Sequence, residues 1–98
     1  MEREEILLCL RRNSDDLKRR GVLHAALFGS RARGDHHISS DTDILIELSP
    51  SVPLTAFDYA GIKADIAELF DGPVDVVNRE GLKTGLHPQV EYDAIYAF

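Results

Sequence analysis

The sequence predicts an α/β (α+β) fold in which a small mixed β-sheet is flanked by helices. Helical and strand-like patterns alternate along the 98 residues, and the apolar runs that resemble strands are short. The order is helix, strand, short helix, strand, helix, strand, which favours helices packed on one sheet. The length fits one compact domain over residues 1–98.

A helix is expected first, over residues 2–20. Apolar side chains recur there at helical spacing and charged residues fill the other positions, as in a helix with one buried face. Gly21 is a favourable end, because glycine is common just past the last helical residue. The apolar positions are Ile6, Leu7, Leu10 and Leu17.

A buried strand is expected next, because residues 23–28 form the short apolar run LHAALF. Gly29 and Ser30 interrupt this run. Ser30 is a competent N-cap for a short helical turn over residues 31–35. Residues 35–40 are polar and indicate a loop.

Residues 41–48 alternate between two faces, as a strand does. One face would carry Thr42, Ile44, Ile46 and Leu48, and the other Asp41, Asp43, Leu45 and Glu47. Residues 55–70 then suggest a second long helix. A third short strand is expected over residues 74–77, and residues 90–98 could form a last helix or strand.

Composition excludes several classes of function. The net charge is −6, with 17 acidic against 11 basic residues, which argues against direct binding of nucleic acid through a broad basic face. Cys9 is the only cysteine, so no disulfide framework is expected and a reducing cytoplasm suits the chain. No signal peptide or membrane span is expected, because the apolar runs are only a few residues long.

Gly29 and Ser30 are the first candidate site residues. Glycine lets a backbone approach a ligand closely, and a helix N-terminus offers free N–H groups to phosphate. An ordinary strand-to-helix turn would explain the same two residues without any ligand.

Three aspartates are the next candidates. The strand period places Asp41 and Asp43 on one face with their α-carbons about 6.5 Å apart, where hard cations could bind to their oxygens. Asp75 lies in an apolar strand, where a carboxylate is costly to bury unless it is paired or bound to metal. Exposed strand edges would equally account for all three acids. If the strand of Asp75 pairs beside the strand of Asp41, the three carboxylates form a two-metal site.

Residues 29–43 read GSRARGDHHISSDTD, that is Gly-Ser, ten intervening residues and Asp-x-Asp. This run resembles the motif of the nucleotidyltransferases, specifically the minimal nucleotidyltransferase domain of the DNA polymerase beta-like superfamily. The resemblance covers about residues 5–80 and implies the nucleotidyltransferase fold. It also implies an enzyme that moves a nucleoside monophosphate from a nucleotide triphosphate to an acceptor.

The resemblance implies metal and catalytic roles for the acids. Asp41 and Asp43 would ligate Mg²⁺, and two such ions are expected in the site. Asp75 would complete the second metal position or take the proton from the acceptor hydroxyl.

The resemblance also implies a binding site for the donor nucleotide, ATP. Ser30 and the backbone near Gly29 would hold its β- and γ-phosphates. Arg31 or Arg33 could also reach the triphosphate, although both could equally be solvated helix charges. The choice of ATP over other nucleotides comes from the resemblance alone.

Other polar side chains near these motifs are weaker candidates. His36 and His37 lie between the two halves of the motif and favour a surface loop. His24 is expected in the core or on a sheet face, and Glu47 shares the face of the aspartates and could support them.

The resemblance finally implies a partner. Larger relatives, such as the antibiotic-modifying adenylyltransferases, add a helical domain that closes the substrate cleft. The sequence shows no such helical domain. Chains of this size look like the antitoxin halves of two-gene modules, which add AMP to a tyrosine of a HEPN-domain ribonuclease toxin. We therefore expect a protein adenylyltransferase antitoxin. A non-catalytic antitoxin that acts by binding alone and a small-molecule adenylyltransferase remain as alternatives.

Overall fold

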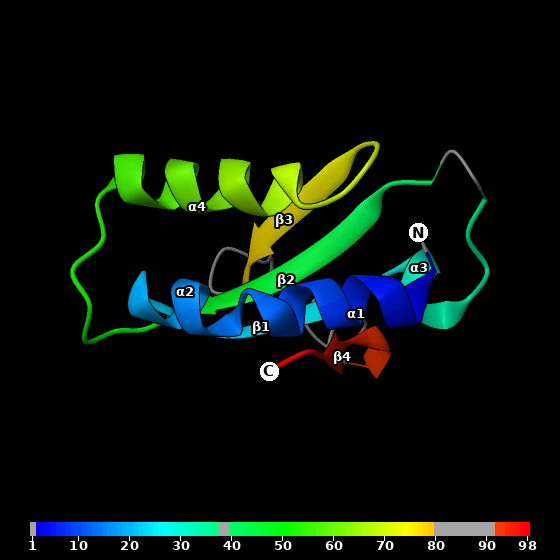
Figure 1. Cartoon of the computed structure of the whole chain (residues 1–98), viewed down its shortest axis with the longest axis horizontal. Coiled ribbons are helices and arrows are strands. Elements are labelled where there is room, and N and C mark those ends of the chain that lie inside the picture. Colours follow the sequence, from blue (N-terminus) through cyan, green and yellow to red (C-terminus); the bar gives the residue numbers. More distant parts are fainter. Residues whose placement is uncertain (1, 38–39, 80–91) are drawn as a thin grey trace.

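A mixed β-sheet forms the centre of the fold (Figure 1). The computed structural model describes residues 2–37, 40–79 and 92–98. Among these residues the strands are β1 (Val22–Phe28), β2 (Thr42–Leu48), β3 (Val74–Asn78) and β4 (Ile95–Tyr96). They lie in the order β3-β2-β1-β4, with β1 antiparallel to β2 and β4, and β2 parallel to β3. The predicted α/β fold with a mixed sheet is therefore confirmed.

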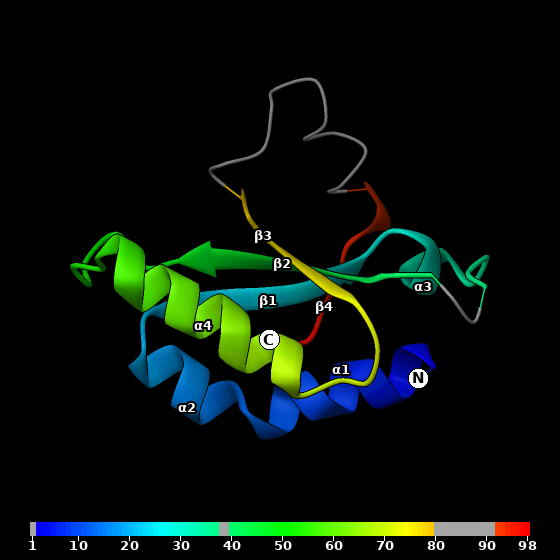
Figure 2. The same cartoon turned by 90° about the horizontal axis from the view of Figure 1, so that it is seen from above.

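Three helices cover one face of this sheet (Figure 2). They are α1 (Arg3–Arg12), α2 (Ser14–Arg19) and α4 (Ala56–Glu68), whereas α3 (Ser30–Arg33) is a single turn directly after β1. Apolar side chains of these three helices pack on the inward-facing residues of the strands. The fully buried members of this core include Ile6, Leu10, Leu27, Ile44, Ile46, Ile62 and Ile66.

The single helix predicted over residues 2–20 is wrong, because the chain breaks it at Asn13 into α1 and α2. The Asn13 side chain donates a hydrogen bond from Nδ2 to the Cys9 carbonyl at 2.8 Å, and φ −100° and ψ 6° leave the helical region. Asparagine side chains compete for backbone groups in this way, which ends helices. Leu17 in α2 is still buried in the core.

Helix α4 connects β2 to β3, and its start is set by a capping box. Thr55 Oγ1 accepts the Asp58 N–H at 3.1 Å, while Asp58 Oδ2 accepts the Thr55 N–H at 2.9 Å. A parallel strand pair needs a crossover of this kind. Gly72, with φ +79°, turns the chain after the helix, so that β3 returns along β2.

The opposite face of the sheet carries a much smaller apolar cluster within the described ranges. Ala26 and Leu45 are buried there, with Phe28 and Ala94 packed against them. Of the segment predicted as a last helix or strand, residues 95–96 form β4, and residues 90–91 lie outside the described residues. No helix in the described part of the chain is long and apolar enough to cross a membrane.

Candidate active site

The turn from β1 into α3 lies at the edge of this second sheet face. Gly29 caps α3 with φ +75° and ψ −156°, and its carbonyl accepts hydrogen bonds from the N–H groups of Ala32 and Arg33, both at 3.1 Å. Ser30 is therefore the first helical residue. The prediction that Ser30 caps the helix is wrong. The cap residue of α3 is Gly29, and its φ of +75° is a backbone conformation that glycine adopts without strain.

Asp43 lies directly against this turn. Phe28, the residue before Gly29, is the register partner of Asp43 on β2. A Cβ built on Gly29 would collide with Oδ2 of Asp43. The absence of a side chain at Gly29 therefore lets the backbone of the turn and the carboxylate come into contact.

The three candidate acids lie on or beside two neighbouring strands. Asp43 on β2 and Asp75 on β3 are register partners in the parallel pair, and paired strands lie about 4.8 Å apart. Asp41 precedes β2 by one residue, so alternation places it toward the same face as Asp43. The strand of Asp75 thus pairs beside the strand of Asp41, which was the condition for a shared site, and the two-metal site itself stays a prediction.

Asp43 is the electrostatic centre of this group. Burial raises the pKa of Asp43 above its usual range, and the charges of Asp75 and Asp41 raise it further. The Arg33 charge acts in the opposite direction and lowers the pKa of Asp43. Ionised Asp43 is thus disfavoured unless another positive charge approaches, which is the condition for attracting a cation.

The donor set fits Mg²⁺, which prefers carboxylate oxygens. In the parts of the chain that the structure describes, no group of three or more His, Cys, Asp or Glu side chains is gathered closely enough to hold a metal ion. Repulsion between carboxylates opposes such gathering without a cation. Asp41, Asp43 and Asp75 therefore stay predicted metal ligands, which the pairing of β2 with β3 brings to the same end of the sheet.

Arg31 is a buried residue of α3. Its Nη2 donates a hydrogen bond to the Ser40 carbonyl at 3.0 Å. This contact fastens α3 to the end of the loop that precedes Asp41. Its role as a nucleotide ligand stays a prediction, and the structure adds a role in holding the two halves of the motif together.

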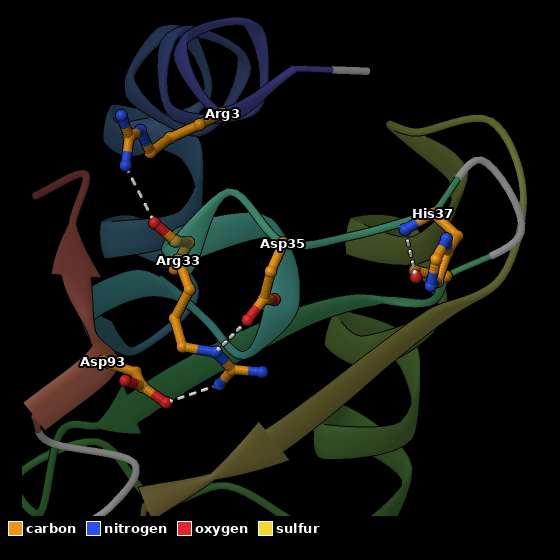
Figure 3. Close-up of polar contacts among 7 residues, drawn as sticks. Arg3, Arg33, Asp35, His37 and Asp93 are labelled. Atoms are coloured by element: carbon orange, nitrogen blue, oxygen red, sulfur yellow. Dashed lines mark hydrogen bonds and ion pairs between the residues drawn. The ribbon is translucent and has the colours of Figure 1, made fainter.

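Arg33 forms ion pairs with two carboxylates, as Figure 3 shows. Its Nε donates to Asp35 Oδ2 at 3.1 Å, and its Nη1 donates to Asp93 Oδ2 at 2.7 Å. Arg3 reaches the same turn from α1 and donates to the Ala32 carbonyl at 2.9 Å. The sequence did not single out Asp93, and no local pattern could, because it lies 60 residues from Arg33.

The other predicted polar residues separate into two places. His37 lies in the loop after α3, where its N–H donates to Ser40 Oγ at 2.8 Å, and His36 Nε2 is 3.7 Å from Glu2 Oε1. His24 is on the sheet face opposite the helices, 3.7 Å from Glu47. That pair lines a hollow of about 400 Å³ further along the face from the aspartates. The other residues of this hollow are Arg79, Tyr96 and Phe98.

A hollow of about 470 Å³ lies elsewhere, between α2 and α4, and exposed Phe57 lines it beside Val52 and Leu54. Asp41, Asp43 and Asp75 do not line it. The chemistry at the end of β1, and not the size of a cavity, therefore marks the candidate site.

Known proteins resemble this chain in sequence and in fold. The sequence profile of the family described as nucleotidyltransferase domain matches residues 10–97. A protein adenylyltransferase called MntA, from Thermococcus cleftensis, is 31% identical over 94 residues, which cover 95% of this chain and 93% of that protein.

Solved structures agree with the sequence comparison. The structure of a candidate minimal nucleotidyltransferase superposes with a TM-score of 0.76 at 33% identity, covering 97% of this chain and 95% of that one. A structure of a tri-AMPylated Shewanella oneidensis HEPN toxin in complex with an MNT antitoxin gives a TM-score of 0.64 at 20% identity. That match covers 95% of this chain and 71% of the other, and at this identity it shows the shared fold alone.

Proposed function

This chain belongs to the nucleotidyltransferase domain family and is a nucleotidyltransferase enzyme, and on that premise we propose that it is an antitoxin that transfers AMP from ATP to a tyrosine of a HEPN toxin. The observation that carries the proposal is the juxtaposition of Gly29, Asp43 and Asp75 on three successive segments of the fold. A turn that accommodates phosphate and carboxylates that accommodate Mg²⁺ are thereby adjacent.

The acids would hold the metal. Asp41, Asp43 and Asp75 offer oxygen ligands on one sheet edge, and bound Mg²⁺ would neutralise charge on the attacking and leaving oxygens. The raised pKa of Asp43 supports this assignment, because its ionised form gains most from a nearby cation.

The turn at Gly29 would receive the β- and γ-phosphates. Since α3 is only one turn long, its dipole is small, and the binding would depend on individual N–H groups, the Ser30 hydroxyl and nearby Arg33. In the reaction, the acceptor oxygen forms a bond to the α-phosphorus as the bond to the β-phosphate oxygen breaks. Pyrophosphate leaves, and Asp75 is the base that we propose for the hydroxyl proton.

The choice of acceptor is supported by the relatives. The Thermococcus relative carries the name protein adenylyltransferase, and the Shewanella structure contains an AMPylated HEPN toxin beside an antitoxin of this fold. The hollow along the open sheet face, unlike an enclosed pocket, is compatible with an acceptor presented by another protein.

The test is transfer to the purified partner. The chain and the HEPN ribonuclease from the same genome are incubated with Mg²⁺ and ATP labelled on the α-phosphate, and mass spectrometry locates the label. We expect AMP on a toxin tyrosine, loss of toxin activity, and neither effect with Asp43→Asn. An Asp65→Asn variant, changed in the helical layer, should transfer normally.

The alternatives give different results. Neutralisation without any label, retained in Asp43→Asn, would mean that the chain acts by binding alone. Label on an added aminoglycoside-type small molecule and none on the toxin would mean that the acceptor is not a protein.

A further inference from the structure

Two carboxylates hold Arg33, and they differ in burial. Asp35 is a near neighbour in sequence with an exposed side chain, whereas only 6% of the Asp93 side chain is exposed. The Arg33–Asp93 contact is also the shorter one, at 2.7 Å against 3.1 Å. A buried carboxylate has few alternative rotamers, so Asp93 is the partner that fixes where the guanidinium lies.

One nitrogen of the guanidinium remains available. Nε and Nη1 are used, while Nη2 makes no hydrogen bond or ion pair to a described residue and points away from Asp93 (Figure 3). The Arg33 side chain is 43% exposed. Arg33 is the last residue of the single helical turn that Gly29 caps, so it lies on the same turn as the proposed phosphate site. An arginine whose Nη2 group is still available beside a site for nucleotides is suited to donate to a phosphate oxygen.

We infer that Asp93 is a positioning residue, which fixes Arg33 so that its Nη2 group is oriented in advance for the triphosphate of the donor nucleotide. This inference rests on the proposed function in one respect, namely that a nucleotide triphosphate binds beside Gly29. An arginine free in solution loses rotamer entropy when it binds phosphate, and the ion pair with Asp93 removes that loss beforehand. The C-terminal part of the described chain thereby supports the phosphate site from 60 residues away.

A purely structural role of the Arg33–Asp93 ion pair predicts a different effect on nucleotide affinity. If the ion pair only tied the segment before β4 to α3, its loss would lower stability and leave nucleotide affinity unaffected once the protein is folded. A double-mutant cycle separates the two roles, since a positioning effect depends on Arg33 being present.

The experiment measures ATP affinity by calorimetry, with Mg²⁺ and without any acceptor, for wild type, Asp93→Asn, Arg33→Ala and the double variant. We expect Asp93→Asn to weaken ATP binding about tenfold, because an unfixed arginine must be ordered at binding. Arg33→Ala should weaken it at least as much, and Asp93→Asn should add nothing in the Arg33→Ala background. An equal loss in both backgrounds, or no loss in either, overturns the inference.

Controls separate folding from positioning. Asp65→Asn removes an ion pair of similar length, 2.6 Å to Arg20, in the helical layer and should leave ATP affinity unchanged. Arg33→Lys keeps a charge for Asp93 but has no second nitrogen to donate to phosphate, so it should fold and still bind ATP about tenfold more weakly. Should Asp93→Asn fail to fold, unchanged ATP affinity in Arg33→Lys would overturn the inference.

The proposed function can fail separately. If ATP binds and the cycle behaves as expected, while no AMP reaches the HEPN protein, then the acceptor is wrong and the role of Asp93 stands. If wild type binds no ATP, both the premise and the inference are overturned.

Discussion

Gly29 and Asp43 are in contact such that a single added methyl group on Gly29 would overlap the Asp43 carboxylate. The contact joins the two halves of the sequence motif, one at the end of β1 and the other on β2. It explains why the motif needs glycine on two grounds, the positive φ and the space beside the carboxylate.

Replacing Gly29 by alanine tests this contact. We expect Gly29→Ala to lower the free energy of unfolding by about 1 to 2 kcal/mol through the positive φ. Displacement of Asp43 should lower kcat for AMP transfer at least about 100-fold. The control is Gly34→Ala, where φ is +85° and nothing lies within 4 Å of the added Cβ. It should show the loss of stability with transfer largely retained, and equal kinetics in the two variants would contradict the role of the contact.

The pH dependence of stability should identify Asp43. Its pKa is raised in the folded protein, so the native state holds this proton more tightly than the unfolded state does. Stability from this group is therefore present below the ordinary carboxyl pKa and is lost as pH rises through the raised value.

Metal-free Asp43→Asn should consequently be more stable than wild type at pH 7, and the difference should shrink at acid pH. Mg²⁺ should then stabilise wild type and have a much weaker effect on the variant. Thermal unfolding with and without Mg²⁺ measures both. A variant less stable than wild type at pH 7 in chelator would show that Asp43 is not under repulsion.

Arg31 should matter for stability as well as for nucleotides. Arg31→Met keeps much of the apolar stem and removes the charged hydrogen bond to the Ser40 carbonyl. A hydrogen bond to a charged group contributes about 1.5 to 3 kcal/mol, and we expect a loss of that size in urea unfolding. Arg19→Met, which removes an exposed 3.5 Å pair with Asp16, should change stability by less than about 0.5 kcal/mol. Similar losses in both variants would contradict a special role for Arg31.

The capping box of α4 should affect stability alone. Thr55→Ala removes the hydroxyl that accepts the Asp58 N–H and should destabilise the fold by about 1 kcal/mol. Thr55→Ser keeps the hydroxyl and should recover most of it. Because α4 lies in the helical layer, kcat and KM for transfer should be unchanged in folded protein, and a changed KM would mean that α4 acts on the site.

Local patterns were sufficient for several elements. Alternation over residues 41–48 separated Ile44 and Ile46 from the face of Leu45, and in the structure the two isoleucines lie in the main core and Leu45 in the smaller cluster. The strand ending at Phe28 was predicted from a different signal, a short continuous apolar run that Gly29 interrupts. Two local details were wrong: Asn13 divides the first helix, and Gly29 rather than Ser30 caps α3. In both, a single side chain or φ value outweighed the periodic signal.

By itself, then, the sequence determined the chemistry available: Gly-Ser at the end of a strand, Asp-x-Asp at the start of another, and an acid in a third. Only the tertiary structure decided which of these residues meet. The parallel pairing of β2 and β3 sets Asp75 beside Asp43, and the packing of the C-terminal segment brings Asp93 to Arg33. The physical reason is that periodicity reports burial within one element, whereas contacts between distant residues depend on how all elements pack together.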